Sequence, residues 1–147
     1  MIADFGLGDR EDGMDIEIIN NPVVKTFNLG KACDGVPEIT GVTYDLWQLR
    51  IMLRFEALDN RVYVTFNRVR GFRVLDEGNL LEFWDPDTRV SGWLWQVQKG
   101  SWFDLERSRE GFMSGVNRDY KEFLVLGIDD CVSVITSQEP QIDTPSP

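Results

Sequence analysis

The side chains that could do chemistry in this chain are almost all carboxylates. The 147 residues include 25 Asp and Glu, no His and two Cys. Histidine is the commonest general base near neutral pH, the usual partner of a Ser or Cys nucleophile and the commonest metal ligand. A carboxylate-only site, of the kind that glycosidases use, is therefore the catalytic chemistry that stays open. Its candidate residues are Glu56, Glu77, Glu82 and Asp85.

The sequence nevertheless predicts a protein without catalytic activity, metal or cofactor. Catalytic carboxylates need matched geometry and separated pKa values, and with this many acids some fall near each other by chance. Cys33 and Cys131 are too few and too far apart in sequence to make a zinc site or a disulfide framework. Cys131 begins an apolar strand, which predicts a small buried thiol. No phosphate-binding loop, EF-hand loop or dinucleotide fingerprint is present.

An acidic stretch with aromatic residues is the strongest candidate for a binding site. It follows a run of arginines at positions 61, 68, 70 and 73. Salt bridges and solvated turns between neighbouring strands are the simpler account of these charges. The functional account is an acidic edge with aromatic anchors that docks on a basic protein surface. The residues predicted to bind a partner are Asp76, Glu77, Glu82, Phe83, Trp84, Asp85 and Asp87.

The tryptophans allow a second hypothesis. Trp93 and Trp95 alternate along one strand face, and Trp102 follows after a turn. Packing in the core is the simpler account, because aromatic side chains dominate core burial. If these three rings instead line a concave surface, the protein is a small β-barrel-like module that binds a flat apolar ligand or a sugar.

Charge and hydropathy narrow the class of partner. The net charge is −10, and residues 1–20 account for half of it, with six acids and one arginine. Such acidity argues against nucleic-acid binding, which needs a basic surface, and is compatible with a cationic protein partner. No apolar run approaches the roughly 20 residues that span a bilayer, and the first 15 residues lack signal-peptide features. We expect a cytoplasmic protein with no membrane contact.

One hairpin, over residues 49–69, organises the predicted fold. Apolar residues alternate with polar ones on both of its strands, which is the period of a half-buried β-strand. Asp59 and Asn60 suit a two-residue turn. This turn predicts a register in which all facing pairs are apolar: Ala57 with Val62, Phe55 with Val64 and Leu53 with Phe66.

The remaining segments predict a mainly β protein. Short strands are expected at residues 15–19 and 23–29, a loop at 30–43, a second hairpin over 90–106 and a third over 122–136. The strands of the third are nearly all apolar, as in a sheet that is covered on both faces. The predicted fold is an antiparallel meander that forms a curved sheet, a half-open barrel or a small sandwich, with or without one short helix. Residues 1–14 are predicted to be a flexible acidic arm, 15–136 a single domain and 137–147 a disordered tail.

Three sequence runs carry a resemblance to a known group of proteins. They are FNRVRGFRVLDEGNLLEFW at residues 66–84, GWLW at 92–95 and VLGIDDCV at 125–132. Together they resemble small acidic bacterial proteins, some of which are immunity proteins of polymorphic or contact-dependent toxin systems. The resemblance covers about residues 46–135. It implies a cytoplasmic protein that binds and blocks a cognate toxin domain, and it assigns no individual binding residue.

Overall fold

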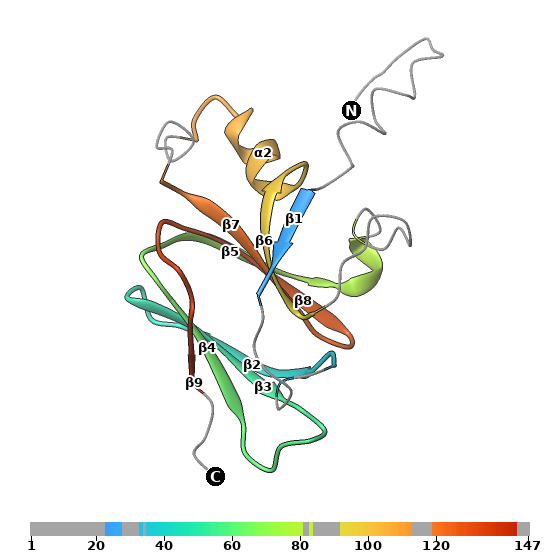
Figure 1. The fold of residues 1–147 in the computed structure, drawn as a ribbon. Coiled ribbons are helices and arrows are strands. Elements are labelled where there is room, and N and C mark those ends of the chain that lie inside the picture. Colours follow the sequence, from blue (N-terminus) through green and yellow to red (C-terminus); the bar gives the residue numbers. More distant parts are fainter. Residues whose placement is uncertain are drawn as a thin grey trace, which may run out of the picture.

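The computed structural model describes residues 23–27, 33, 35–80, 83, 92–112 and 119–143, and these form two antiparallel sheets (Figure 1). The five-stranded sheet has the spatial order β1 (Val23–Thr26), β6 (Leu94–Lys99), β7 (Lys121–Leu126), β8 (Asp130–Thr136), β5 (Val69–Asp76). The four-stranded sheet has the order β2 (Glu38–Tyr44), β3 (Gln48–Arg54), β4 (Val62–Asn67), β9 (Gln141–Asp143). The prediction of a mainly β fold is confirmed, and the sheets do not close into a barrel.

The two sheets pack against each other through the apolar faces of their strands. Phe66 of β4 meets Phe123 of β7 with 5.5 Å between ring centroids. The apolar side chains that alternate along β3 and β4 are all fully buried: Leu49, Ile51, Leu53, Val62, Val64 and Phe66. Burying one large apolar side chain contributes roughly 1.5–3 kcal/mol, so this shared core is the main source of stability.

The second face of the five-stranded sheet is also covered. The short helix α2 (Trp102–Arg107) lies on it, with the Trp102 ring close to Gly71 of β5. Phe83 reaches the same face and lies 6.0 Å from Trp95 between ring centroids. Successive side chains of β7 are therefore buried on both sides, as its apolar sequence predicted. The third hairpin is confirmed by the pairing of Leu126 with Cys131.

The main hairpin is present, but its predicted register is wrong. The observed pairs are Leu53 with Val62, Ile51 with Val64 and Leu49 with Phe66. The chain turns earlier than predicted, because the backbone N–H of Leu58 donates to the Phe55 carbonyl at 3.2 Å. Asp59 and Asn60 belong to the longer loop that follows. The shift is by an even number of residues, so the apolar side chains of the two strands keep their face, whereas Ala57 lies in the turn and is exposed.

Three other segments differ from the prediction. Strand β2 overlaps the predicted loop at 30–43 over most of its length and pairs with β3. Residues 101–106 were predicted as a returning strand, but all except the first belong to α2, in which Trp102 Nε1 donates to Glu106 Oε2 one turn on at 3.0 Å. The predicted disordered tail contains β9, which pairs with β4. The predicted strand at 23–29 is confirmed as the shorter β1, whereas the arm at 1–14 and the strand at 15–19 lie outside the described residues.

Candidate protein-binding surfaces

The structure describes three of the seven residues that were predicted to form an acidic binding edge. Asp76 and Glu77 are exposed, at the end of β5 and the start of the 3-10 turn η2 (Glu77–Asn79). Phe83 is 3% exposed and packs on Trp95, so the prediction that it is a surface anchor is wrong. The remaining predicted residues lie outside the described part of the chain: Glu82, Trp84, Asp85 and Asp87.

Asp76 and Glu77 belong to an acidic corner that also includes Asp129 and Asp130. Asp76 faces Asp130 in the pairing of β5 with β8, and the Glu77 N–H donates to the Asp129 carbonyl at 3.0 Å. All four side chains are exposed. The sequence assigned the second pair only to a hairpin turn, and the strand order that joins the two turns was not predictable from either. The apolar side chain of Ile128, 57% exposed, adjoins them in the chain.

The three tryptophans proposed to line a ligand cavity do not do so. Trp93 and Trp95 are 2% and 1% exposed and belong to the core. Trp93 also packs on Phe55 and donates its indole N–H to the Cys33 carbonyl at 3.0 Å. Trp102 is half-buried at the start of α2. The alternative of a concave site lined by these three rings is wrong, because Trp93 and Trp95 fill the interior.

Among the described residues, the large apolar side chains with the greatest exposed fraction lie at the turn between β2 and β3. Leu46 is 80% exposed and Trp47 is 82% exposed, and we call these two residues the tip surface. Asp45 fixes the turn, since its Oδ1 accepts the backbone N–H groups of Trp47 at 2.9 Å and Gln48 at 2.8 Å. These two donors hold the pKa of Asp45 below its usual range. The turn is thus ordered although its apolar side chains face solvent.

Both left-handed non-glycine residues of the described chain lie at this end of the molecule. Leu46 has φ 77° and Arg68 has φ 55°. Arg68 is the single residue between β4 and β5, so the chain passes from one sheet to the other there. The buried Thr136 hydroxyl holds this crossing by contacting the carbonyls of Asn67 at 2.5 Å and Arg68 at 3.3 Å. Left-handed backbone is disfavoured for residues with a Cβ, and such positions concentrate at functional sites.

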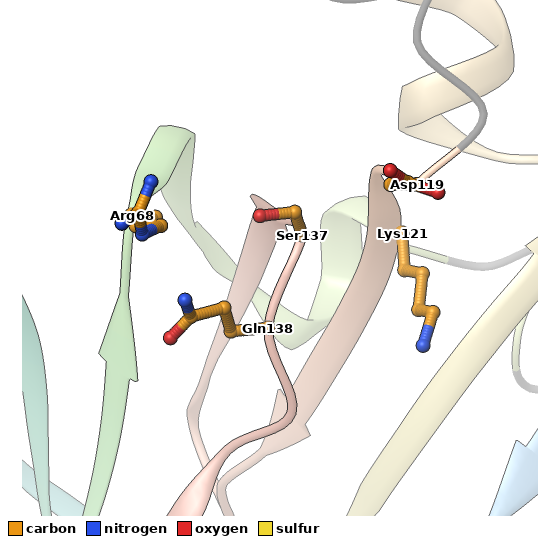
Figure 2. A pocket seen from close by; sticks show the side chains of 5 residues that line it. All are labelled: Arg68, Asp119, Lys121, Ser137 and Gln138. Carbon is orange, nitrogen blue, oxygen red and sulfur yellow. The ribbon is translucent and has the colours of Figure 1, made fainter.

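Two open grooves meet at Arg68. The tip groove, of about 610 Å³, is lined by Asp45, Leu46, Trp47, Gln48, Asn67, Arg68, Val69 and Arg70. The second groove, of about 370 Å³, is lined by Arg68, Asp119, Lys121, Ser137 and Gln138 (Figure 2). We call it the corner groove; it is separate from the acidic corner, which lies at the other end of β5. Figure 1 shows why the two grooves adjoin: the β2–β3 turn, the β4–β5 crossing and the segment after β8 lie at the same end of the sheets. This site was not predicted from the sequence. The feature that could have indicated it is Asp45, two residues before Trp47, because an Asp at that position commonly fixes a turn.

No protein-family model matches the chain. Comparisons with curated proteins and with solved structures also found no match. The resemblance to immunity proteins therefore stays a prediction.

One buried acid stands apart from these surfaces. Glu122 of β7 is 1% exposed beneath α2, and its Oε1 accepts the backbone N–H of Phe103 at 2.8 Å. Its second oxygen makes no hydrogen bond to any described residue. Burial raises the pKa of Glu122 to about 7, although the Phe103 amide and the Arg73 guanidinium act to lower it. Glu122 was not among the carboxylates selected from sequence.

Other candidate chemistry is sparse in the described residues. Cys33 and Cys131 are both buried and free, and burial raises the pKa of both thiols, that of Cys131 to about 11. Within the described ranges, no three Cys, Asp or Glu side chains are grouped so that they could hold a metal ion. The described helices include none that is long and apolar enough to cross a membrane.

Proposed function

We propose that this protein is a non-catalytic binding protein that contacts another protein through the tip surface. The observation that carries the proposal is the exposure of Leu46 and Trp47 on an ordered turn. Tryptophan is among the residues that most often dominate the binding energy of protein interfaces. A turn that is already ordered loses little conformational entropy on binding, which favours affinity.

The class of partner follows from the sequence resemblance. We propose a toxin domain that the protein neutralises by contact, encoded by a neighbouring gene. Such a toxin is expected to be basic, as nucleases usually are, and the acidic corner offers it a second surface. That corner lies at the far end of β5 from Arg68, so the two surfaces can be tested separately.

The test is a binding measurement with the protein that the adjacent gene encodes. Trp47→Ala is expected to weaken binding about 30-fold or more, because a central aromatic anchor contributes at least about 2 kcal/mol. Leu105→Ala is the control, since Leu105 on α2 is also a large exposed apolar side chain, at 66% exposure. It should leave affinity unchanged.

Two results would redirect the proposal. If Trp47→Ala binds as the wild type does, the tip surface is not the interface. If Asp129→Lys with Asp130→Lys removes binding instead, the interface is the acidic corner. That corner includes Asp76 and Glu77, which the sequence predicted to bind the partner. Asp129 and Asp130 are exposed in a hairpin turn, so a thermal melt of the double variant serves as the folding control.

A further inference from the structure

Positive charge gathers around the tip surface although the whole protein is acidic. Arg68 and Arg70 line the tip groove. The corner groove is lined by Arg68 on one side and by Lys121 and the carboxylate of Asp119 on the other, so its positive charge is concentrated at Arg68. The carboxylate of Asp45 is occupied by backbone N–H groups. Charges farther away than about 8–10 Å are largely screened at physiological salt, so a ligand in these grooves responds mainly to the nearby arginines.

Arg68 has its guanidinium available for a ligand. It is exposed and makes no ion pair within the described chain. The neighbouring Arg70 lies over the Tyr120 ring and donates its Nε hydrogen to the Tyr120 hydroxyl. Its contact in the described chain is therefore with an aromatic residue and not with a carboxylate. Lys121 differs, because its Nζ contacts Glu139 Oε2 at 2.9 Å. Of the described cations that line the two grooves, Arg68 is thus the one most open to an incoming group.

Two neutral donors accompany Arg68 in the corner groove. Figure 2 shows the Ser137 hydroxyl and the Gln138 amide on the segment that follows β8, between Arg68 and Lys121. Neither side chain donates a hydrogen bond within the described residues, while the Gln138 backbone N–H donates to Thr136 Oγ1 at 3.2 Å. The same Thr136 hydroxyl donates to the carbonyls of Asn67 and Arg68, so it links the Gln138 backbone to the Arg68 backbone. The donors are therefore held near one another by the fold.

We propose that the corner groove binds a carboxylate side chain of the partner, and that the tip groove takes an apolar residue next to it. The inference rests on the proposed function and specifies the partner segment as an acidic, apolar peptide. An arginine guanidinium matches a carboxylate with two parallel hydrogen bonds, and the hydroxyl and amide can supply more. Leu46, Trp47 and Val69 supply the apolar wall of the adjoining groove.

The experiment uses the full chain and two synthetic probes, acetyl-Leu-Glu-Leu-amide and acetyl-Leu-Gln-Leu-amide. Binding is followed by the NMR shifts of the backbone amides of residues 47, 68, 137 and 138. We expect the Glu peptide to bind about tenfold more tightly than the Gln peptide, since a hydrogen bond to a charged group contributes more than a neutral one.

The variant that isolates the arginine is Arg68→Asn. Asparagine tolerates left-handed backbone, so this change removes the charge while the β4–β5 crossing keeps its conformation. The tenfold preference for the Glu peptide should disappear. Arg61→Asn is the control, because Arg61 is an exposed arginine in the loop after β3, outside both grooves. It should retain the preference.

The proposal is overturned if both peptides bind equally, if neither shifts these amides, or if Arg68→Asn retains the preference. Each of these results leaves the Trp47→Ala test with the neighbouring protein intact. A loss of partner binding in Trp47→Ala, together with equal binding of the two peptides, would retain the interface and reject the carboxylate. Normal partner binding by Trp47→Ala would reject the tip surface itself.

Discussion

At Leu46, the stability of the fold and the proposed contact with a partner favour different residues. A leucine with φ 77° and 80% of its surface exposed gains little from burial and bears an unfavourable backbone conformation. The left-handed region costs a residue with a Cβ roughly 1–2 kcal/mol, a cost that glycine escapes. A sequence optimised only for folding would place glycine or asparagine there. The leucine is consistent with a role in contacting a partner.

Leu46→Gly tests this opposition directly. We expect the free energy of unfolding to rise by up to about 1 kcal/mol, because relief of the backbone strain exceeds the flexibility that glycine adds to the unfolded chain. Partner binding should weaken, since the apolar side chain is lost. The measurements are chemical denaturation and the binding assay described for Trp47. A variant that is less stable and binds normally would contradict the interpretation.

At the scale of elements, the sequence predicted which face of a strand is buried better than it predicted which residues pair across neighbouring strands. The alternation in β3 and β4 identified the buried apolar side chains of both strands, because a period of two is a local property, whereas Thr65 is buried although it was assigned to the polar face. The register was wrong, because the turn at Phe55–Leu58 depends on one backbone hydrogen bond that competes with the Asp59–Asn60 turn. Likewise, Trp102 favours strands by propensity, yet it lies in a helix, where its indole N–H donates to Glu106 one turn on.

The candidate site was harder to predict than the fold. Its residues come from four segments that are joined only by the strand order: the β2–β3 turn, the β4–β5 crossing, residues 119–121 and residues 137–138. Each segment alone is an ordinary polar turn. The sequence instead singled out the aromatic residues, and the structure places Phe83, Trp93 and Trp95 in the core. Aromatic residues serve both roles, and only burial distinguishes them.

The contact between α2 and β7 makes stability depend on pH. Glu122 has a pKa of about 7 in the folded protein against 4.5 for an ordinary glutamate, and the nearby Arg73 of β5 and Asp104 of α2 act in opposite directions on it. Because the folded-state pKa is raised, this group's contribution to stability is complete below pH 4.5 and is lost as the pH rises through 7.

Glu122→Gln should therefore stabilise the protein above pH 7, by roughly 1–3 kcal/mol, and make little difference near pH 5. Glutamine keeps an oxygen to accept the Phe103 N–H. Glu106→Gln, on α2, is the control with the opposite sign, because Arg109 and Trp102 hold the pKa of Glu106 below its usual value. Denaturation curves at pH 5 and pH 8 decide the question. Equal effects of Glu122→Gln at both values would show that the carboxyl is ionised throughout.

At the scale of the molecule, the two sheets leave edges that need protection from pairing with other chains. An exposed strand edge is a template for association. The longer edge strands each carry an irregularity that disfavours such pairing: β2 at Ile39–Gly41 and β5 at Val69–Gly71. Strand β4 has no such irregularity, and its outer edge is covered by the three residues of β9. The C-terminal segment thus completes the four-stranded sheet.

Removing residues 139–147 should expose that edge. The truncation deletes β9, the partly buried Ile142 that packs on the core, and the Glu139 partner of Lys121. We expect the Tm to fall by roughly 2–8 °C, as for a loss of about 1–2 kcal/mol in a domain of this size. Concentration-dependent association should follow, because the newly exposed β4 edge can pair with a second copy. A chain that lacks only residues 144–147 keeps β9 and is the control. If both truncated chains melt at the same temperature and stay monomeric by light scattering, β9 contributes nothing to the stability of the fold.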